Sequence, residues 1–414
     1  MRAFLSILAF LCLAQAGPLR AQDLAILTSF PGQFSEEFVQ AFADRHPERD
    51  IRVLNKNTVA AVDEVLRGNT RRFGIFWASA PEAFAILKRA GAFAPAGICG
   101  AGGPASVEPF AISAVGWAKR RDAAVLMPGD WNDLLKPIYR GKVAMARPSR
   151  SGTTHMLVEQ ILQVRGWDDG WAYLLELAGN LSTLTARSFG VPEGLMDRRF
   201  DIGFTIDFLA QSRAEALQFR YGRPVVLAKA QIGILKQVRD PRAACEFVSM
   251  ILSREGQLAL LKPNIGRVPY DPAIRAEFED QLPEGIIQTL RLPWLNYDAG
   301  MSADRYWSVN TLFDLMITEQ LTERRDLWRR AHALDGRVAP ERLAHLRRAL
   351  TAIPISRDEA QEASRRIAGG VRGTVLVSLG DAEREIVHAW RPRIGKALAG
   401  ARAELETLER QAEK

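Results

Sequence analysis

Short apolar runs alternate with amphipathic stretches in the first quarter of the chain. The apolar runs at 23–28, 51–55 and 72–78 have the length and composition of buried strands. Between them, Phe34, Phe38 and Phe42 recur every four residues, and 57–67 also has a helical pattern. Strands that alternate with helices at this spacing predict a parallel sheet with right-handed crossovers.

A second unit of the same kind follows. Residues 109–119 have the pattern of one long strand that crosses into this unit. Strand-like runs come next at 141–145, 181–185, 201–206 and 217–220, and residues 225–236 can return the chain to the first sheet. The pattern therefore predicts two α/β units that are connected by crossing strands.

The C-terminal part of the chain is predominantly helical, and its last helix has an apolar face. Pro392 predicts a kink or a new helix start near the beginning of this face. The pattern favours packing of the face against the protein's own body, and pairing with a partner helix is the alternative. The face repeats every three or four residues and comprises Val387, Trp390, Ile394, Leu398, Ala401, Leu405 and Leu408.

The stretch after the run at 141–145 combines helix-starting residues with hydrogen-bond donors. It reads Pro148-Ser149-Arg150-Ser151-Gly152-Thr153-Thr154-His155 and leads into an amphipathic helix. A helix N-terminus has about four unpaired N–H groups and roughly half a positive charge. Further donors are the guanidinium of Arg150 and the hydroxyls of Ser149, Ser151, Thr153 and Thr154. Gly152 permits close approach of the backbone to a ligand. Together these groups predict an anion-binding site. An ordinary Ser/Thr helix cap is the alternative.

Polar side chains also stand where other predicted strands end. Ser29 and Ser79 follow the strands at 23–28 and 72–78, and ligands of such sheets bind beyond the carboxyl ends of the strands.

In the second unit, the strand ends carry Arg187 with Ser188, Asp207 and Tyr221. Arginine can hold a phosphate or carboxylate at two points, and aspartate accepts hydrogen bonds from sugar-like hydroxyls. The set predicts a small anionic ligand with a hydroxyl; a structural Arg187–Asp207 ion pair is the alternative.

Composition is that of an ordinary globular protein, and the first residues have the pattern of a signal peptide. The chain has 414 residues, of which 47% are hydrophobic and 25% charged, and a formal net charge of +7. Its basic residues are scattered, which disfavours nucleic acid as a partner.

Residues 1–21 combine Arg2 with an apolar run and two candidate cleavage points, after Ala16 or Ala21, of which we favour Ala21. We expect an exported chain with no later membrane-spanning segment.

Two cysteines remain outside the signal peptide. Cys99 and Cys245 can pair in an oxidising compartment. The helical pattern around Cys245 instead favours a buried thiol at that position.

No motif in the sequence indicates catalysis or a metal site. None of the 5 His residues has HExxH spacing, and neither a G-x-S-x-G motif nor a P-loop occurs. Ser149 or Ser151 would need a base within hydrogen-bond reach to act as a nucleophile, and we expect His155 to be a packed or capping histidine. The sequence therefore predicts a binding protein, not an enzyme, with no cofactor and no metal.

These residues together resemble a known family. The strand ends Thr28-Ser29-Phe30 and Ala78-Ser79-Ala80-Pro81 and the segment Glu255-Gly256-Gln257 are similar to those of bacterial extracellular solute-binding proteins of the iron- and phosphosugar-binding type. Within this family, Pro148-Ser149-Arg150-Ser151, Gly179-Asn180-Leu181 and Arg187-Ser188-Phe189-Gly190-Val191 resemble members that serve phosphoglycerate transport.

The resemblance implies an α/β, type II periplasmic-binding-protein fold: two α/β lobes with hinge crossovers that close on ligand, plus a C-terminal helical extension. It implies lobe 1 at 22–112 and 234–300, lobe 2 at 113–233 and the extension at 301–414. It also implies a periplasmic protein that captures a phosphoglycerate-like anion for an inner-membrane ABC permease or for the periplasmic domain of a sensor kinase. Residues 149–154 and Arg187 would then hold the anion, Ser29 and Ser79 would close from the other lobe, and Asp207 would contact hydroxyls.

The chain also departs from the family pattern. Gly74 stands in the third strand where the family often has Asp, and the adjacent tyrosines of iron-binding members are absent. Ferric iron is therefore disfavoured, although Tyr221 can still line the cleft. Two alternatives to anion capture stay open: a ferric-iron-binding periplasmic protein, and an interaction protein that acts through the C-terminal helices without a small ligand.

Overall fold

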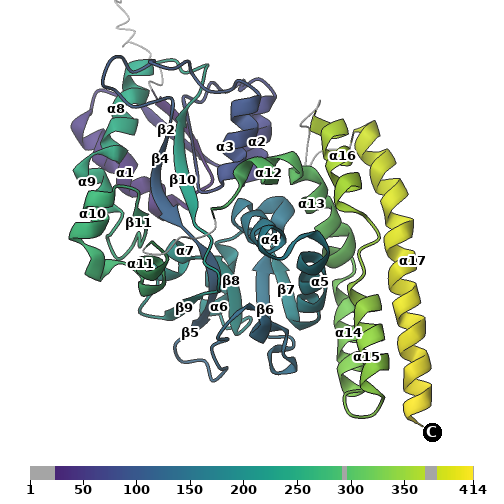
Figure 1. Cartoon of the computed structure of the whole chain (residues 1–414). Coiled ribbons are helices and arrows are strands. Elements are labelled where there is room, and N and C mark those ends of the chain that lie inside the picture. Colours follow the sequence, from purple (N-terminus) through teal and green to yellow (C-terminus); the bar gives the residue numbers. More distant parts are fainter. Residues whose placement is uncertain (1–23, 291–295, 369–379, 414) are drawn as a thin grey trace, which may run out of the picture.

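Two β-sheets form the centre of the molecule, and a layer of helices lies along one side of both (Figure 1). The structure is a computed structural model that describes residues 24–290, 296–368 and 380–413. The expected signal peptide, residues 1–21, lies outside the described residues. No described helix combines the length and apolar character needed to span a bilayer.

The first sheet contains the three parallel strands expected from the N-terminal pattern. Its order is β11-β4-β10-β3-β1-β2, with β10 antiparallel to β3 and β4. Helix α1 buries Phe34, Phe38 and Phe42, as their spacing predicts. The strands are β1 (Leu24–Thr28), β2 (Ile51–Asn55), β3 (Ile75–Ala78), β4 (Val107–Ser113), β10 (Ala228–Ile234) and β11 (Val268–Pro269). The helices are α1 (Gly32–Arg45), α2 (Thr58–Leu66), α3 (Pro81–Arg89), α8 (Pro241–Leu252), α9 (Arg254–Ala259), α10 (Pro272–Glu277) and α11 (Glu284–Leu290).

The second sheet has the order β7-β6-β8-β5-β9, and its central strands are fully buried. Helix α4 follows β6 and buries most of its length. The strands are β5 (Val115–Arg120), β6 (Val143–Ala146), β7 (Leu181–Thr185), β8 (Ile202–Ile206) and β9 (Leu217–Tyr221). The helices are α4 (Gly152–Arg165), α5 (Trp167–Leu177), α6 (Gly190–Met196) and α7 (Asp207–Gln211).

The chain passes between the sheets at two places. The expected single strand at 109–119 is in fact two strands, β4 and β5, which lie in different sheets on either side of Ala114. Asp207 holds this junction, because its Oδ2 accepts from the N–H of Ala114 (2.8 Å) while its own N–H donates to the Ala114 carbonyl (3.0 Å). The return passage joins β9 to β10, as the pattern at 225–236 predicts. Two short crossovers of this kind permit hinge motion.

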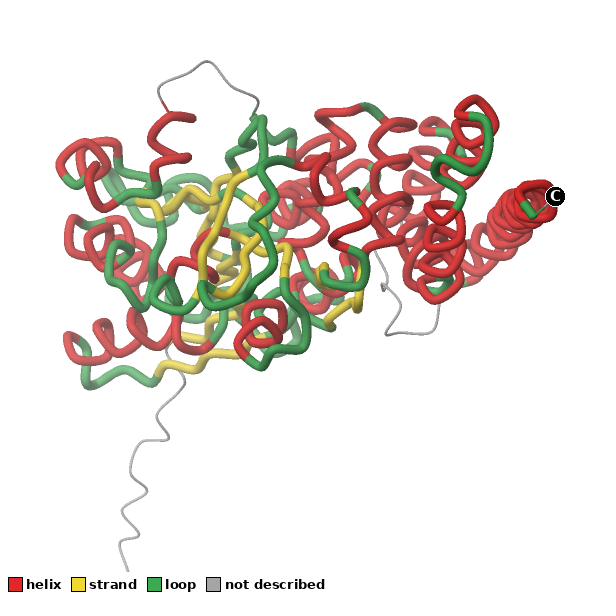
Figure 2. Tube along the Cα trace, turned by 90° about the horizontal axis from the view of Figure 1, so that it is seen from below, coloured by secondary structure: helices red, strands yellow, loops and turns green. Residues whose placement is uncertain are grey.

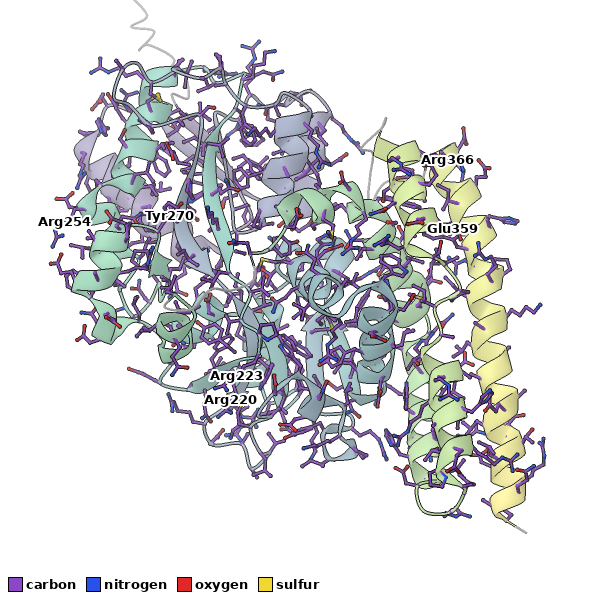
Figure 3. All side chains as sticks on the ribbon, viewed as in Figure 1. Arg220, Arg223, Arg254, Tyr270, Glu359 and Arg366 are labelled. Atoms are coloured by element: carbon purple, nitrogen blue, oxygen red, sulfur yellow. A yellow bond between two sulfur atoms is a disulfide. The ribbon has the colours of Figure 1, made fainter. Side chains whose placement is uncertain are left out.

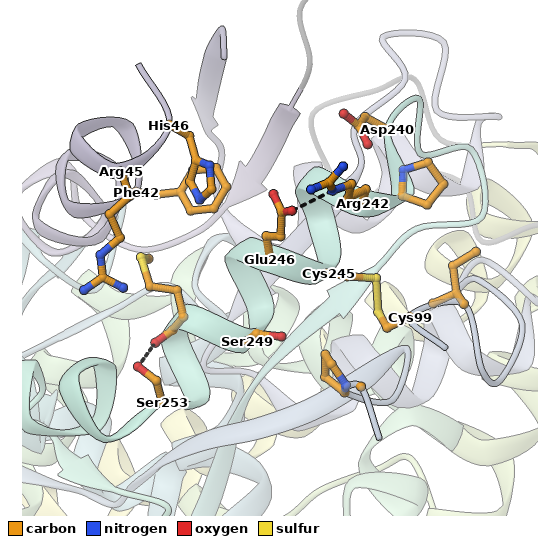
Figure 4. Close-up of a pocket in the computed structure, with 15 residues that line it drawn as sticks. Phe42, Arg45, His46, Cys99, Asp240, Arg242, Cys245, Glu246, Ser249 and Ser253 are labelled. Carbon is orange, nitrogen blue, oxygen red and sulfur yellow. Dashed lines mark hydrogen bonds and ion pairs between the residues drawn. A yellow bond between two sulfur atoms is a disulfide. The ribbon is translucent and has the colours of Figure 1, made fainter. Parts of the chain in front are cut away.

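A disulfide joins Cys99 to Cys245 and fastens the loop before β4 to α8 (Figure 4). The expectation of a buried thiol at Cys245 is therefore wrong. The helical pattern around Cys245 is correct, but its side chain is turned toward the loop. A disulfide is typical of a chain that folds in an oxidising compartment.

The C-terminal helices pack against the body of the protein, and Figure 2 shows them as a layer beside the sheets. Trp328 of α14 lies where Gly179 has no side chain, since a Cβ at Gly179 would be 2.6 Å from the indole. The indole Nε1 donates to the Leu175 carbonyl (2.9 Å). The helices are α12 (Ala299–Asp304), α13 (Tyr306–Phe313), a π-helical turn (Asp314–Thr318), α14 (Leu321–Ala333), α15 (Pro340–Thr351), α16 (Arg357–Ala368) and α17 (Asp381–Ala412).

The apolar face of the last helix packs internally. Pro392 lies within a single helix, α17, and does not start a new one. All members of the face are buried apart from the partly buried Val387, so the expectation that it packs on the protein's own body is confirmed. Glu359 of α16 points toward α17 (Figure 3) and accepts from Trp390 Nε1 (2.9 Å) and Arg393 Nη2 (2.9 Å).

Candidate anion-binding site

The residues between β6 and α4 form the start of a helix whose first N–H groups are unpaired within the helix. Pro148–Arg150 form a 3₁₀ turn, and α4 begins at Gly152. Ser151 is its N-cap: Ser151 Oγ accepts from the Thr154 N–H (3.2 Å) and from Thr154 Oγ1 (3.0 Å). Ser151 and Thr154 thus make the ordinary cap that was the alternative interpretation. The N–H groups of Gly152 and Thr153 stand at positions for which a helix has no acceptor of its own.

A cavity of about 30 Å³ lies at this helix start, between the strand ends of the two lobes. Such a volume holds about one or two water molecules. Of the residues that the sequence singled out, Ser29, Ser79, Arg150, Ser151, Gly152, Thr153, Arg187 and Ser188 line the cavity. The remaining lining residues are Phe30, Pro31, Asn57, Thr58, Ala80, Phe208 and Leu209.

The lobes touch directly across the cavity. Nη2 of Arg187, in the loop that follows β7, donates to Oδ1 of Asn55 at the end of β2 (2.6 Å). A Cβ on Gly152 would lie 2.6 Å from Oγ1 of Thr58. The two lobes are therefore closed on each other, and glycine alone fits at the start of α4.

The charge of the cavity lining is positive and is not balanced by a carboxylate. Arg150 and Arg187 line the cavity, and the lining includes no Asp, Glu, Tyr or His. Burial, and secondarily the charge of Arg150, lowers the pKa of Arg187. Arg187 packs over the Phe189 ring, with 4.6 Å from Cζ to the ring centroid. Nε of Arg150 is buried and has no acceptor among the described residues. An anion placed here would relieve the repulsion between the two guanidinium groups.

Four of the expected site residues do not line the cavity. Ser149 is 2% exposed, and its Oγ has no partner among the described residues. Thr154 is buried in the helix cap. Asp207 and Tyr221 lie behind the cavity and contact each other, with the tyrosine hydroxyl donating to Oδ2 (3.2 Å).

The expected contact between Asp207 and a ligand hydroxyl is not supported by this placement. The carboxylate is 2% exposed and accepts from the N–H groups of Ala114 and Phe208, each at 2.8 Å. Burial raises the pKa of Asp207 to about 6, although those N–H groups oppose the shift. Asp207 holds the crossover instead. The alternative of an Arg187–Asp207 ion pair is also wrong, since Arg187 binds Asn55.

Sequence reasoning missed Asn57, Thr58, Phe208 and Leu209. Asn57 and Thr58 follow β2, which is parallel to β1 and adjacent to it, so the strand-end rule that found Ser29 also applies to them. Phe208 and Leu209 lie in the first turn of α7 and are apolar, so their residue type gave no signal.

A larger groove of about 880 Å³ lies on the outer side of the first sheet (Figure 4). Its charged side chains are already paired with each other or with neighbours. Arg242 contacts Glu246 (2.9 Å), Asp240 contacts Arg49 (2.8 Å), and Arg45 contacts Glu255. The small cavity is therefore the better candidate for a charged ligand. Within the described ranges, no group of three or more His, Cys, Asp and Glu is arranged to hold a metal ion.

A family model and two related sequences match this chain. The family model of bacterial extracellular solute-binding proteins matches residues 31–262. The phosphoglycerate transport regulatory protein PgtC of Salmonella typhimurium is 32% identical over 241 residues, which are 57% of this chain and 58% of PgtC. The matched region thus spans less than two thirds of that relative. An uncharacterized protein of Haemophilus influenzae is 29% identical over 140 residues, 32% of this chain and 39% of that protein.

Solved structures confirm the fold. The periplasmic binding protein AfuA of Actinobacillus pleuropneumoniae, with fructose-6-phosphate bound, has a TM-score of 0.62 and 18% identity, over 71% of this chain and 98% of AfuA. The apo ferric ion-binding protein A of Pasteurella haemolytica has a TM-score of 0.56 and 14% identity, over 71% of this chain and 97% of that protein. The expected two-lobe periplasmic-binding-protein fold with additional C-terminal helices is therefore correct.

Proposed function

The chain belongs to the bacterial extracellular solute-binding proteins, and we propose that it captures a small phosphorylated or carboxylated anion, phosphoglycerate-like, in the periplasm. Proteins of this family bind solutes and interact with membrane transport components. The proposed ligand contacts are the N-terminus of α4 with Arg150, Arg187 and Ser188, and Ser29 and Ser79 from the opposite lobe.

The observation that carries the proposal is the lining of the cavity: two arginines and a helix N-terminus, with no carboxylate among the lining residues. Backbone N–H groups at a helix start and paired guanidinium groups are suited to phosphate oxygens. The name of PgtC and the fructose-6-phosphate bound to AfuA agree with a phosphorylated ligand.

Capture of such a ligand requires the lobes to part. The closed cavity of about 30 Å³ is smaller than a three-carbon phosphorylated acid. The two crossovers, at Ala114 and between β9 and β10, are the expected hinges. Ligand would then enter the open cleft and replace the Arg187–Asn55 contact as the link between the lobes.

The two alternatives are less well supported. Ferric iron favours anionic oxygen ligands, whereas the hydroxyl of Tyr221 binds Asp207 and neither residue lines the cavity. The apolar face of α17 is buried internally, so it is not free to pair with a partner helix, as a protein that interacts through that face would require. The captured ligand would be passed to an ABC permease or presented to the periplasmic domain of a sensor kinase.

Thermal unfolding of the chain from Gln22 onward tests the proposal. The ligands are 2- and 3-phosphoglycerate, phosphoenolpyruvate, glucose 6-phosphate, inorganic phosphate and ferric citrate, with glycerol as an uncharged control. A ligand at about 100 times its Kd stabilises the native state by about 2.7 kcal/mol. We expect a selective increase in Tm with the phosphorylated acids. An increase with ferric citrate alone, or no increase with any ligand, would overturn the assignment.

A further inference from the structure

Arg267 is a fully buried arginine that sits next to the cavity. It precedes β11 at the edge of the first sheet and is 2% exposed. Its Cζ lies 4.1 Å from the Phe208 ring centroid and 4.7 Å from that of Phe30. Its Nη2 donates to the hydroxyls of Ser79 (3.0 Å) and Ser113 (3.1 Å).

The guanidinium of Arg267 has donors without acceptors. Nε and Nη1 are buried, and neither has a hydrogen-bond partner among the described residues. Asp207 acts on Arg267 electrostatically, but its oxygens are occupied by Ala114, Phe208 and Tyr221. Burial accordingly lowers the pKa of Arg267 to about 9. Proteins rarely bury a cation without an anion bonded to it, and no carboxylate of the described residues forms an ion pair with Arg267.

The neighbours of Arg267 connect it to the cavity. Phe30, Ser79 and Phe208 contact the guanidinium and also line the cavity. Phe30 and Ser79 follow strands of the first sheet, whereas Phe208 follows β8 of the second. Parting of the lobes would move Phe208 away from the guanidinium. The same motion would carry α4, which follows β6 of the second sheet, away from Arg267. A ligand held at α4 would therefore meet the uncovered guanidinium of Arg267 as the lobes close on it.

We infer that Arg267 is a second anion subsite, which takes the carboxylate of a ligand whose phosphate is held by the N-terminus of α4 and Arg187. This inference rests on the proposed function. A guanidinium matches the planar carboxylate group, and the helix N-terminus with two arginines suits the tetrahedral phosphate. The site would therefore select ligands with two anionic ends over phosphosugars with one.

A pair of ligands that differ in one group tests the inference. 3-Phosphoglycerate and glycerol 3-phosphate share the phosphate and the three-carbon backbone, and the second has a hydroxymethyl group in place of the carboxylate. Calorimetric titration of the wild type should give 3-phosphoglycerate an affinity on the order of 10- to 100-fold higher, as for a charge-assisted hydrogen bond. Arg267→Met should remove this preference and leave the affinity for glycerol 3-phosphate within about threefold. Arg267→Lys, which keeps the charge, should retain part of it.

The outcomes distinguish failure of the carboxylate subsite from failure of the proposed function. Equal affinities of the wild type for both ligands would overturn the carboxylate subsite and leave phosphate binding intact, and this result needs no variant to fold. A preference that persists in Arg267→Met would also overturn it. Absence of binding of either ligand to the wild type would remove the proposed function and the inference together. Arg254→Met, an exposed arginine paired with Glu277, is the matched control and should keep the wild-type preference.

Discussion

Arg147 and Asp314 form a two-point ion pair that joins the start of the anion site to the C-terminal extension. Nε and Nη2 of Arg147 donate to Oδ1 and Oδ2 of Asp314 over 2.6 and 2.8 Å. Arg147 immediately follows β6, and Asp314 begins the π-helical turn. Insertions of this kind in helices are frequent at functional sites. The extension is thus attached to the second lobe beside the residues proposed to bind the ligand.

Asp314→Asn should destabilise the attachment of the extension. The change removes the charge that pairs with Arg147, and Asp314 is nearly buried, with 6% side-chain exposure. We expect the free energy of unfolding in urea to fall by about 1–3 kcal/mol. The control Glu323→Gln removes the partner of Arg402 in an exposed pair of the same extension and should cost less than about 1 kcal/mol. Equal losses in both variants would contradict a special role of the Arg147 pair.

Gly152→Ala should hinder closure of the lobes. Its Cβ would meet Thr58 Oγ1 at 2.6 Å and the Ala80 side chain at 2.9 Å, both across the cavity. We expect the affinity for ligand to fall about tenfold, and small-angle scattering to report a larger radius of gyration with ligand present. Gly395→Ala on α17 has open space at its Cβ and should change neither quantity. Ligand-induced compaction of Gly152→Ala to the wild-type value would show that the closed contact is dispensable.

Arg187→Ala should weaken binding of an anion far more than it changes stability. Arg187 is partly exposed, and its hydrogen bond to Asn55 crosses between the lobes. We expect the affinity for a phosphorylated ligand to fall by on the order of 10- to 100-fold and the unfolding free energy without ligand to change by less than about 1 kcal/mol. Arg199→Ala, an exposed arginine in the same lobe, is the control. A lower Tm with unchanged affinity would make Arg187 structural.

The fold was predictable from the sequence because its signals are local. Apolar runs and helical spacings fix the strands and helices of both sheets, and the resemblance supplies their assembly. The break at Ala114 was not predictable, because the pattern at 109–119 is continuous. It depends on Asp207, which lies 93 residues away in the sequence.

The candidate site was predictable where a residue type and a strand end coincide. Ser29, Ser79 and Arg187 line the cavity for this reason. Burial is the property that sequence reasoning could not supply: Asp207 has the residue type of a ligand contact but is enclosed, and Arg267 gave no signal although it contacts the cavity lining. Both outcomes depend on how the two lobes pack, which no short pattern encodes.

A series of buried, hydrogen-bonded side chains predicts how the stability of the protein depends on pH. Glu82 of α3 accepts from the Tyr297 hydroxyl (3.2 Å), which also contacts Ser302 (2.8 Å), and Ser302 contacts Nε2 of His155 in α4 (2.9 Å). Burial raises the pKa of Glu82 from 4.5 to about 8 and lowers the pKa of His155 from 6.5 to about 3. The native state therefore holds the Glu82 proton that the unfolded chain releases near pH 4.5. The stabilisation from this raised pKa of Glu82 is complete below pH 4.5 and is lost as pH rises through about 8.

Glu82→Gln should remove this loss of stability at alkaline pH, because glutamine stays neutral and can still accept from Tyr297. The measurement is urea unfolding between pH 6.5 and 8.5. His155 is neutral in the native state over this range and titrates only in the unfolded chain, so it adds the same slope to the wild type and the variant and cancels in their difference. One linked proton changes stability by at most about 1.4 kcal/mol per pH unit, so the wild type should lose about 1–2 kcal/mol more than the variant across this range. Glu48→Gln, at an exposed surface position, should follow the wild type. Parallel curves for Glu82→Gln and the wild type would mean that Glu82 is already ionised in the native state at pH 6.5.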